Sequence, residues 1–197
     1  MNLNFEKMAY SLMMMGVFGE KLLIKEKYRP KGMFPSEVLT FLAACVTQSA
    51  MFAVESGVLN GFSSVMLRKI HGDVVSFEKN PTEAVLAEFG ESLIVGDSME
   101  TIPEWLEQNT DKGPFGVLID GPKGLKAIQL KDDIMAKFPA VKVVGIHDLL
   151  PNQGESLHTQ NMPDGLDLLS KIDDRFVPAE WRAKYPNGPG LALWLRD

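Results

Sequence analysis

Between residues 51 and 148, short apolar runs alternate with longer amphipathic ones, and this alternation limits the fold more than any other feature of the sequence. The short runs, rich in Val, Ile and Phe, predict strands, and the longer runs predict helices. The five predicted strands cover residues 51–55, 73–78, 92–97, 114–120 and 141–148. The helices between them cover residues 60–72, 80–90, 99–109 and 122–139. This order predicts an α/β fold, doubly wound and Rossmann-like, with a mostly parallel sheet and helices on both faces.

The two ends of the chain have different patterns. Residues 1–50 have apolar side chains at helical spacing and predict a helical N-terminal extension, whose methionine-rich face would suit a lid or a homodimer contact. Residues 51–197 form the predicted cofactor-binding domain. Within it, residues 149–190 are polar and contain many Pro and Gly residues, and we expect this long irregular segment to determine substrate specificity. A last apolar strand is predicted at residues 191–197.

Composition narrows the class of protein. The chain has 197 residues, of which 45% are hydrophobic and 23% charged, and this is enough to bury a core in one domain. The net charge of −6 argues against a nucleic-acid partner, because such proteins usually present a basic face. No apolar run approaches about 18 residues, so we expect no membrane partner. The single cysteine, Cys45, excludes an internal disulfide, is expected to be buried and unreactive, and favours a cytoplasmic location.

Every predicted strand ends with an acidic residue. These residues are Glu55, Glu78, Asp97, Asp120 and Asp148. In a parallel sheet the carboxyl ends of the strands meet at one edge, where open α/β folds bind their ligands. Because gathering carboxylates costs solvation free energy, we expect a ligand, a cation or water among them. Glu78 and Asp97 have a structural alternative, since acidic residues also favour the first turn of a helix.

The loop ESGVLNG after the first predicted strand indicates a nucleoside ligand. Gly57 and Gly61 allow a tight turn and a close approach of the backbone to a ligand. Glu78, at the end of the next strand, is placed to accept hydrogen bonds from ribose hydroxyls. Glu55 would repel a pyrophosphate but suits the cationic amino group of a methionine moiety. The loop also lacks the G-x-G-x-x-G spacing of a dinucleotide site, so S-adenosylmethionine fits better than NAD, and an NAD-type oxidoreductase is the weaker alternative.

In their order and spacing, several stretches resemble a class I S-adenosylmethionine-dependent methyltransferase. They are VESGVLNGFSS, VVSFEKNP, LIVGDSMETIPEWL, VLIDGPKG and VGIHDL. The resemblance implies contacts from Glu55, Gly57, Gly61 and Ser63 to the methionine end, from Glu78 to the ribose, from Asp97 and Ser98 to the adenine, and from Asp120 near the methyl sulfonium. Leu59 stands where the family commonly has a glycine, and this departure keeps a non-catalytic binding protein or scaffold as an alternative.

The predicted reaction is methyl transfer to a hydroxyl of a small molecule. The enzyme aligns the acceptor with the methyl group, and a hydroxyl also has to lose its proton. His147, with Asp148 beside it, is the predicted catalytic base, although a structural histidine bonded to Asp148 is the alternative. Asp120 and Asp148 would instead bind Mg²⁺ if a metal orients the acceptor. An ion pair between Lys123 and Asp120 would make that metal unnecessary.

Overall fold

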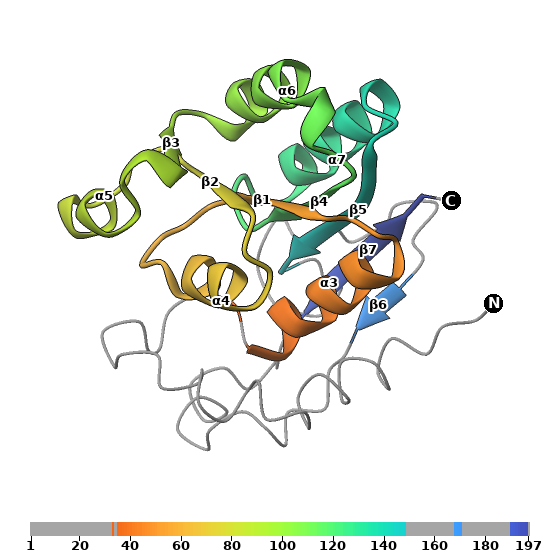
Figure 1. Ribbon diagram of the computed structural model, residues 1–197, viewed down its shortest axis with the longest axis horizontal. Helices are drawn as coiled ribbons and strands as arrows, with labels where there is room; N and C mark the ends of the chain where they lie inside the picture. Colours follow the sequence, from red (N-terminus) through yellow and green to blue (C-terminus); the bar gives the residue numbers. More distant parts are fainter. Residues whose placement is uncertain (1–32, 34, 149–167, 171–189, 197) are drawn as a thin grey trace.

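The computed structural model describes residue 33 and residues 35–148, 168–170 and 190–196 (Figure 1). The predicted lid or dimer segment before residue 33 and most of the predicted specificity segment at 149–190 lie outside these residues. Their roles therefore stay predictions.

Within the described residues, seven strands form one sheet in the order β3-β2-β1-β4-β5-β7-β6. The strands are β1 (Phe52–Ser56), β2 (Val74–Glu78), β3 (Leu93–Val95), β4 (Phe115–Ile119), β5 (Val141–His147), β6 (Leu168–Ser170) and β7 (Leu191–Leu195). Neighbours among β1 to β5 run parallel, while β7 is antiparallel to both β5 and β6. The strand order reverses between β1 and β4, which is the switch point where open α/β sheets bind ligands.

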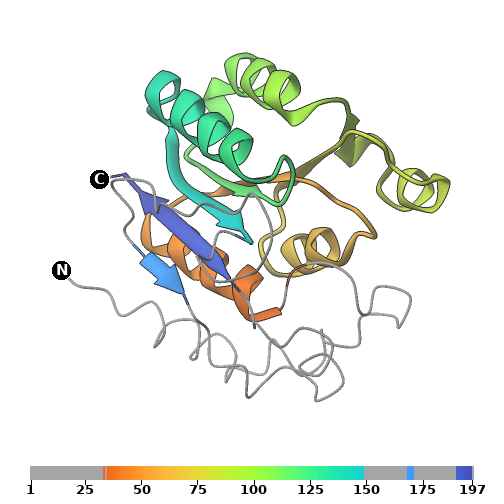
Figure 2. The same cartoon turned by 180° about the vertical axis from the view of Figure 1, so that it is seen from behind.

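Helices cover both faces of the sheet, as the sequence predicts (Figures 1 and 2). They are α3 (Pro35–Thr47), α4 (Phe62–Ile70), α5 (Glu83–Phe89), α6 (Ser98–Gln108) and α7 (Leu125–Lys137). One core cluster joins α3 and α4 to strand residues such as Ala53, and the other joins α6 and α7 to residues such as Val54. Successive residues of β1 thus enter opposite cores, as the period of two in a strand requires.

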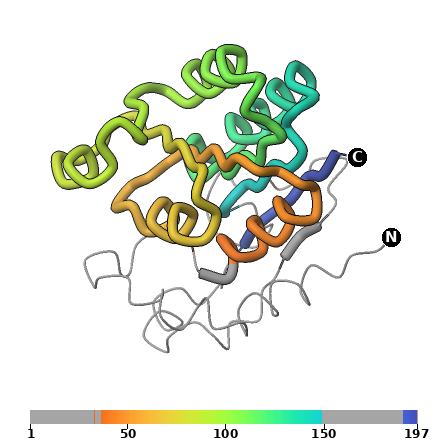
Figure 3. The backbone as a smooth tube through the Cα atoms, in the orientation of Figure 1, coloured from red at the N-terminus to blue at the C-terminus, as the bar shows by residue number. Residues whose placement is uncertain are grey.

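Helix α3 packs directly on the middle of the sheet, although its sequence lies in the predicted N-terminal extension. It contacts β4, β5 and β7, and Figure 3 shows it beside β7. Glycines in the two central strands make room for it: a Cβ at Gly116 would collide with Cys45 Sγ, and a Cβ at Gly145 would lie 3.1 Å from Phe41 Cδ2. Cys45 is buried and free, as predicted, and burial raises the pKa of its thiol.

Three helices begin later than the sequence pattern predicts, α4 by two residues and α5 and α7 by three. The helix predicted at 80–90 begins at Glu83. The side chain of Thr82 accepts a hydrogen bond from the N–H of Val85 and so caps the start of this helix. The helix predicted at 122–139 begins at Leu125, which leaves residues 121–124 as a loop at the edge of the sheet. Among the described helices, none is both long enough and apolar enough to cross a membrane.

The loops that follow β1 and β4 are bonded together at the switch point. The carbonyl of Ser56 accepts the N–H groups of Asp120 at 2.7 Å and Gly121 at 3.1 Å. We call this contact between the two loops the seam. Gly57 packs so closely against it that an added Cβ would lie 2.6 Å from Gly121 N. The φ of Gly57, +86°, is also in the left-handed region. Both features require glycine at position 57 whether or not a ligand is bound.

We predict that Gly57→Ala lowers the free energy of unfolding by about 3 kcal/mol, because left-handed strain and a backbone collision add. Gly72→Ala is the matched control: Gly72 has a φ of +96° with nothing within 4 Å of the added Cβ. That variant should lose only about 1 kcal/mol. Urea unfolding followed by circular dichroism measures both, and equal losses would show that the seam tolerates a side chain.

Candidate functional site

The loop between β1 and α4 carries the predicted cofactor-binding glycines. Gly57, Leu59 and Gly61 have φ angles of 86°, 50° and 84°, so three of its residues adopt the left-handed conformation. Leu59 does so without being glycine, and its side chain is exposed. Ser63, predicted to bind the methionine end, lies buried in the first turn of α4, just beyond this loop.

Glu78, the predicted ribose acceptor, binds this loop directly. Its Oε2 accepts the N–H groups of Val58 at 2.8 Å and Leu59 at 3.0 Å, and its Oε1 accepts the N–H of Asn80 at 3.1 Å. Partial burial raises the pKa of Glu78, but these backbone hydrogen bonds outweigh it and the net shift is downward. An ionised carboxylate has about four acceptor positions, so Glu78 keeps capacity for further donors. It does not cap α5, which Thr82 caps.

Asp97 takes the structural role that the sequence left open for it. Its Oδ1 accepts the N–H of Met99 at 3.0 Å and caps α6, and its Oδ2 forms an ion pair with Lys79 at 2.8 Å. Ser98 is the first residue of α6 and is buried. The predicted contacts of Asp97 and Ser98 with adenine stay predictions.

Glu55 lies inside the protein rather than at the strand end. It is the second-last residue of β1 and points, like Ala53, toward α4, where Ser64 donates a hydrogen bond to its Oε2. Ser76 on β2 donates to the same oxygen at 2.6 Å. Burial raises the pKa of Glu55, although serine hydroxyls and the charge of Arg68 oppose the rise. Oε1 has no hydrogen-bond partner among the described residues.

The carboxyl ends of β4 and β5 bring together the predicted catalytic and metal-binding residues. Asp120 follows β4, and His147 ends β5 with Asp148 directly after it. Asp148 has a left-handed φ of 61° and its N–H bonds to the carbonyl of Gly190 at 2.9 Å. His147 Nε2 lies 3.1 Å from Asp148 Oδ1 and 3.7 Å from Asp120 Oδ1. The structure therefore gathers three of the predicted site residues at one point.

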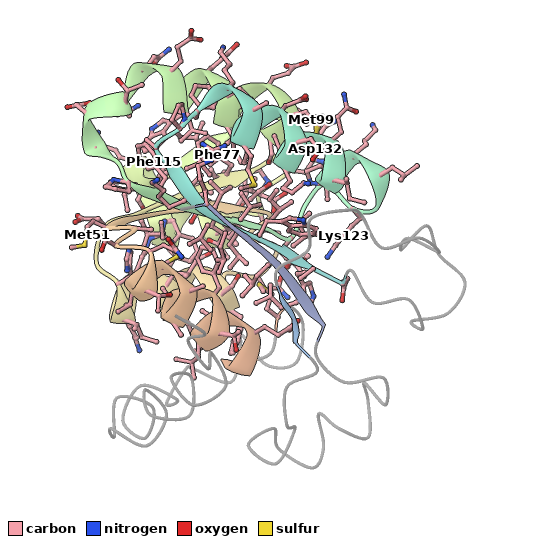
Figure 4. All side chains as sticks on the ribbon, turned by 90° about the vertical axis from the view of Figure 1, so that its right-hand side faces the viewer. Met51, Phe77, Met99, Phe115, Lys123 and Asp132 are labelled. Atoms are coloured by element: carbon pink, nitrogen blue, oxygen red, sulfur yellow. The ribbon has the colours of Figure 1, made fainter. Side chains whose placement is uncertain are left out.

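Lys123 completes this cluster from the loop before α7. Its ammonium forms ion pairs with Asp120 Oδ1 and, at 2.9 Å, with Asp148 Oδ2. Figure 4 shows Lys123 at this edge of the sheet. Burial lowers the pKa of Lys123, but the two carboxylates outweigh it and the net shift is upward. The ion pair with Asp120, an alternative at the level of sequence, is thus present.

Glu37 on α3 is the residue of this cluster that the sequence analysis missed. Its side chain is fully buried, and its Oε1 lies 2.9 Å from His147 Nδ1 and 2.9 Å from the N–H of Gly190. One carboxylate oxygen thus joins α3, the end of β5 and the start of β7. The sequence did contain a signal, because Glu37 is the only charged residue in the helix PSEVLTFLAACVT, and a buried carboxylate needs a partner.

The surroundings of His147 favour its charged form. Burial lowers the pKa of the ring, but the charges of Glu37 and Asp120 and the hydrogen bond to Glu37 raise it to about 9. This shift favours the imidazolium, with Nδ1–H directed at Glu37 and Nε2–H at Asp148. In this state it donates protons and accepts none.

Comparison with known proteins identifies the fold. No family model and no curated protein matches the sequence. The solved structure of CalS11, a TDP-rhamnose 3′-O-methyltransferase of calicheamicin biosynthesis, has a TM-score of 0.55 at 17% identity, covering 98% of this chain and 92% of that one. The structure of an O-methyltransferase from Bacillus cereus in complex with SAH has a TM-score of 0.55 at 12% identity. The match covers 96% of this chain and 91% of that one. TomG is an O-methyltransferase of tomaymycin synthesis from Streptomyces achromogenes, solved in complex with SAM. Its structure has a TM-score of 0.52 at 15% identity, and the match covers 100% of this chain and 92% of that one.

These likenesses confirm the predicted Rossmann-like fold, which this chain shares with the three O-methyltransferase structures. The strand order β3-β2-β1-β4-β5 with the reversal between β1 and β4 agrees with a doubly wound sheet.

The pairing of His147 with Glu37 predicts stability that falls as pH rises. The pKa of His147 is near 6.5 when unfolded and about 9 when folded, because the effects of Glu37 and Asp120 outweigh burial and the charge of Lys123. Asp148 also faces the ring, with its Oδ1 3.1 Å from Nε2. A raised folded-state pKa contributes stability that is complete below about pH 6.5 and is lost as pH rises through about 9. The loss should be about 3 kcal/mol, measured by urea unfolding from about pH 6 to about pH 10.

Glu37→Gln is the control for this pH dependence, because it keeps a hydrogen-bond acceptor and removes the charge. Its stability should change much less over the same pH range. Equal slopes for the wild type and Glu37→Gln would contradict the assignment of the charge pair.

Proposed function

We propose that this protein transfers a methyl group from S-adenosylmethionine to a hydroxyl group of a small molecule. The observation that carries the proposal is the left-handed glycine loop at the switch point, whose Val58 and Leu59 amides bind Glu78. This arrangement places an ionised acceptor and a close-approaching backbone at the edge where open α/β sheets bind ligands. The similar structures include one described with SAM and one with SAH.

The described residues fit this cofactor in kind and charge. Acidic groups suit ribose hydroxyls and a cationic amino-acid tail, and they disfavour a pyrophosphate. The residues proposed to hold the cofactor are Glu55, Gly57, Gly61, Ser63, Glu78, Asp97, Ser98 and Asp120. Glu55 would act through its unpartnered Oε1, from beneath the loop. When bound, the cofactor supplies an electrophilic methyl group on a positively charged sulfur.

His147 and Asp148 would serve the acceptor. Transfer to a hydroxyl requires alignment and the removal of a proton. His147 Nε2 faces Asp120 and Asp148 at the sheet edge, so its neutral form could accept that proton. Because Glu37 favours the charged ring, this base would work better as pH rises toward 9.

A non-catalytic S-adenosylmethionine-binding protein is the second candidate. Two features of the residues proposed to serve the acceptor favour it. The raised pKa of His147 favours the charged ring, which cannot accept a proton, and Lys123 already pairs with Asp120 and Asp148. Neither feature involves the residues of the glycine loop after β1. The two candidates therefore differ in turnover and agree in cofactor binding.

Calorimetric titration with S-adenosylhomocysteine tests the cofactor assignment, with NADH as the negative control. Wild type should bind the first and not the second. Glu78→Ala should weaken binding by about tenfold or more, because charged hydrogen bonds to the ribose are lost. Glu83→Ala, which removes a nearby exposed acid on α5, should bind as wild type. Unchanged affinity in Glu78→Ala would contradict the ribose role, and no binding by wild type would refute both candidates.

The pH dependence of turnover separates the two candidates. With labelled S-adenosylmethionine and a panel of hydroxylated small molecules, kcat should be about tenfold higher near pH 9 than near pH 7.5, since only the neutral His147 ring accepts a proton. Glu37→Gln should move this rise to lower pH, because the charge that raises the pKa of His147 is removed. A rate independent of pH, or full activity in His147→Ala, would remove His147 as the base.

A further inference from the structure

The ammonium of Lys123 lies between two carboxylates that come from different strands. It forms one ion pair with Oδ1 of Asp120, which follows β4. It forms another, 2.9 Å long, with Oδ2 of Asp148, which follows β5. The Asp120 side chain is only 12% exposed and the Asp148 side chain 32%, so both carboxylates are partly removed from water. Partly buried carboxylates that meet in this way need a positive charge between them.

The same two carboxylates, with the neutral form of His147, form a donor set that suits a divalent metal. Asp120, His147 and Asp148 each offer one ligand atom, and these atoms lie within 4.8 Å of one another. Behind His147, Glu37 accepts from Nδ1 at 2.9 Å. A carboxylate behind the second ring nitrogen is the usual support of a metal-binding histidine. The described residues thus include three possible metal ligands and a carboxylate, Glu37, that would orient one of them.

Lys123 and a divalent ion cannot use this set together. The ammonium contacts an oxygen of each aspartate, and a metal ion at the same oxygens would lie within a few Å of it and be repelled. Lys123 is also tethered three residues after Asp120, so its binding has no association entropy to overcome. Mg²⁺, in contrast, gives up its water reluctantly. While Lys123 holds this position, the residues do not fit a bound metal.

We propose that Lys123 is the resident cation of this site and takes the place that a divalent metal would occupy among Asp120, His147 and Asp148. The predicted Mg²⁺ is then replaced by a side chain of the protein itself. The proposal concerns the acceptor end of the site and does not depend on methyl transfer, because cation binding can be measured without the cofactor.

Titration with Mn²⁺ alone, followed by the loss of the free-ion signal in electron paramagnetic resonance, tests the proposal. Wild type should bind Mn²⁺ weakly, and Lys123→Ala should bind one ion at least about tenfold more tightly, because two carboxylates lose their counter-charge. Lys123→Arg keeps the positive charge and should stay weak. Asp120→Asn in the Lys123→Ala background should abolish the gain, which locates the ion at this cluster.

Each outcome decides the proposal. Tight binding of one Mn²⁺ by wild type, lost in Asp120→Asn, would overturn it, since the lysine would then yield to the metal. Equally weak binding by wild type, Lys123→Ala and Lys123→Ser would also overturn it, because the cluster would not be a cation site. Thermal unfolding checks that each variant is folded, and Lys123→Ser provides a second variant if Lys123→Ala is not. Titration with S-adenosylhomocysteine in EDTA is read separately and reports on the proposed function alone.

Discussion

The close contact between the loops after β1 and β4 is the constraint on which the site depends. Ser56 binds the backbone of Asp120 and Gly121, and Gly57 lies too near Gly121 for any side chain. The seam falls where the strand order reverses, so the helices that follow β1 and β4 leave toward opposite faces of the sheet (Figure 1). The glycine loop and Asp120 are thereby fixed side by side. A looser contact would separate the glycine loop from Asp120.

Two buried carboxylates lie next to this edge of the sheet, and each has a different kind of hydrogen-bond partner. Glu55 is surrounded by neutral hydroxyls, with Arg68 bonded to Ser76 at 3.0 Å. Glu37 is bonded to a charged histidine and a backbone N–H. A buried charge without such partners would be strongly destabilising. The first arrangement ties β1, β2 and α4 together, and the second ties α3 to β5 and β7, so both brace the sheet edge that carries the site.

The sequence predicted the sheet, its helices and the acidic strand ends, because these features follow from local periodicity. It did not predict the direction of Glu55, although a period of two places it with Ala53 on the face toward α4. Glu37 was missed since its partner His147 lies 110 residues away, and no local pattern identifies such a pair. Lys123 was expected inside a helix that begins two residues later, at Leu125. Strand β6 escaped prediction because its pairing with β7 depends on tertiary structure.

The charges at the carboxyl ends of β4 and β5 constrain what this edge of the sheet can bind. Three carboxylates, from Glu37, Asp120 and Asp148, face two cations, the Lys123 ammonium and the His147 imidazolium. One negative charge therefore remains in excess. A ligand with a single positive charge beside Asp120 would balance the cluster, whereas a pyrophosphate would add to the excess. A divalent metal would overshoot the balance unless one of the two resident cations left. Under the proposed function, the sulfonium of S-adenosylmethionine would supply that single positive charge. The charge balance depends on residues from α3, from the ends of β4 and β5 and from the loop before α7 acting together.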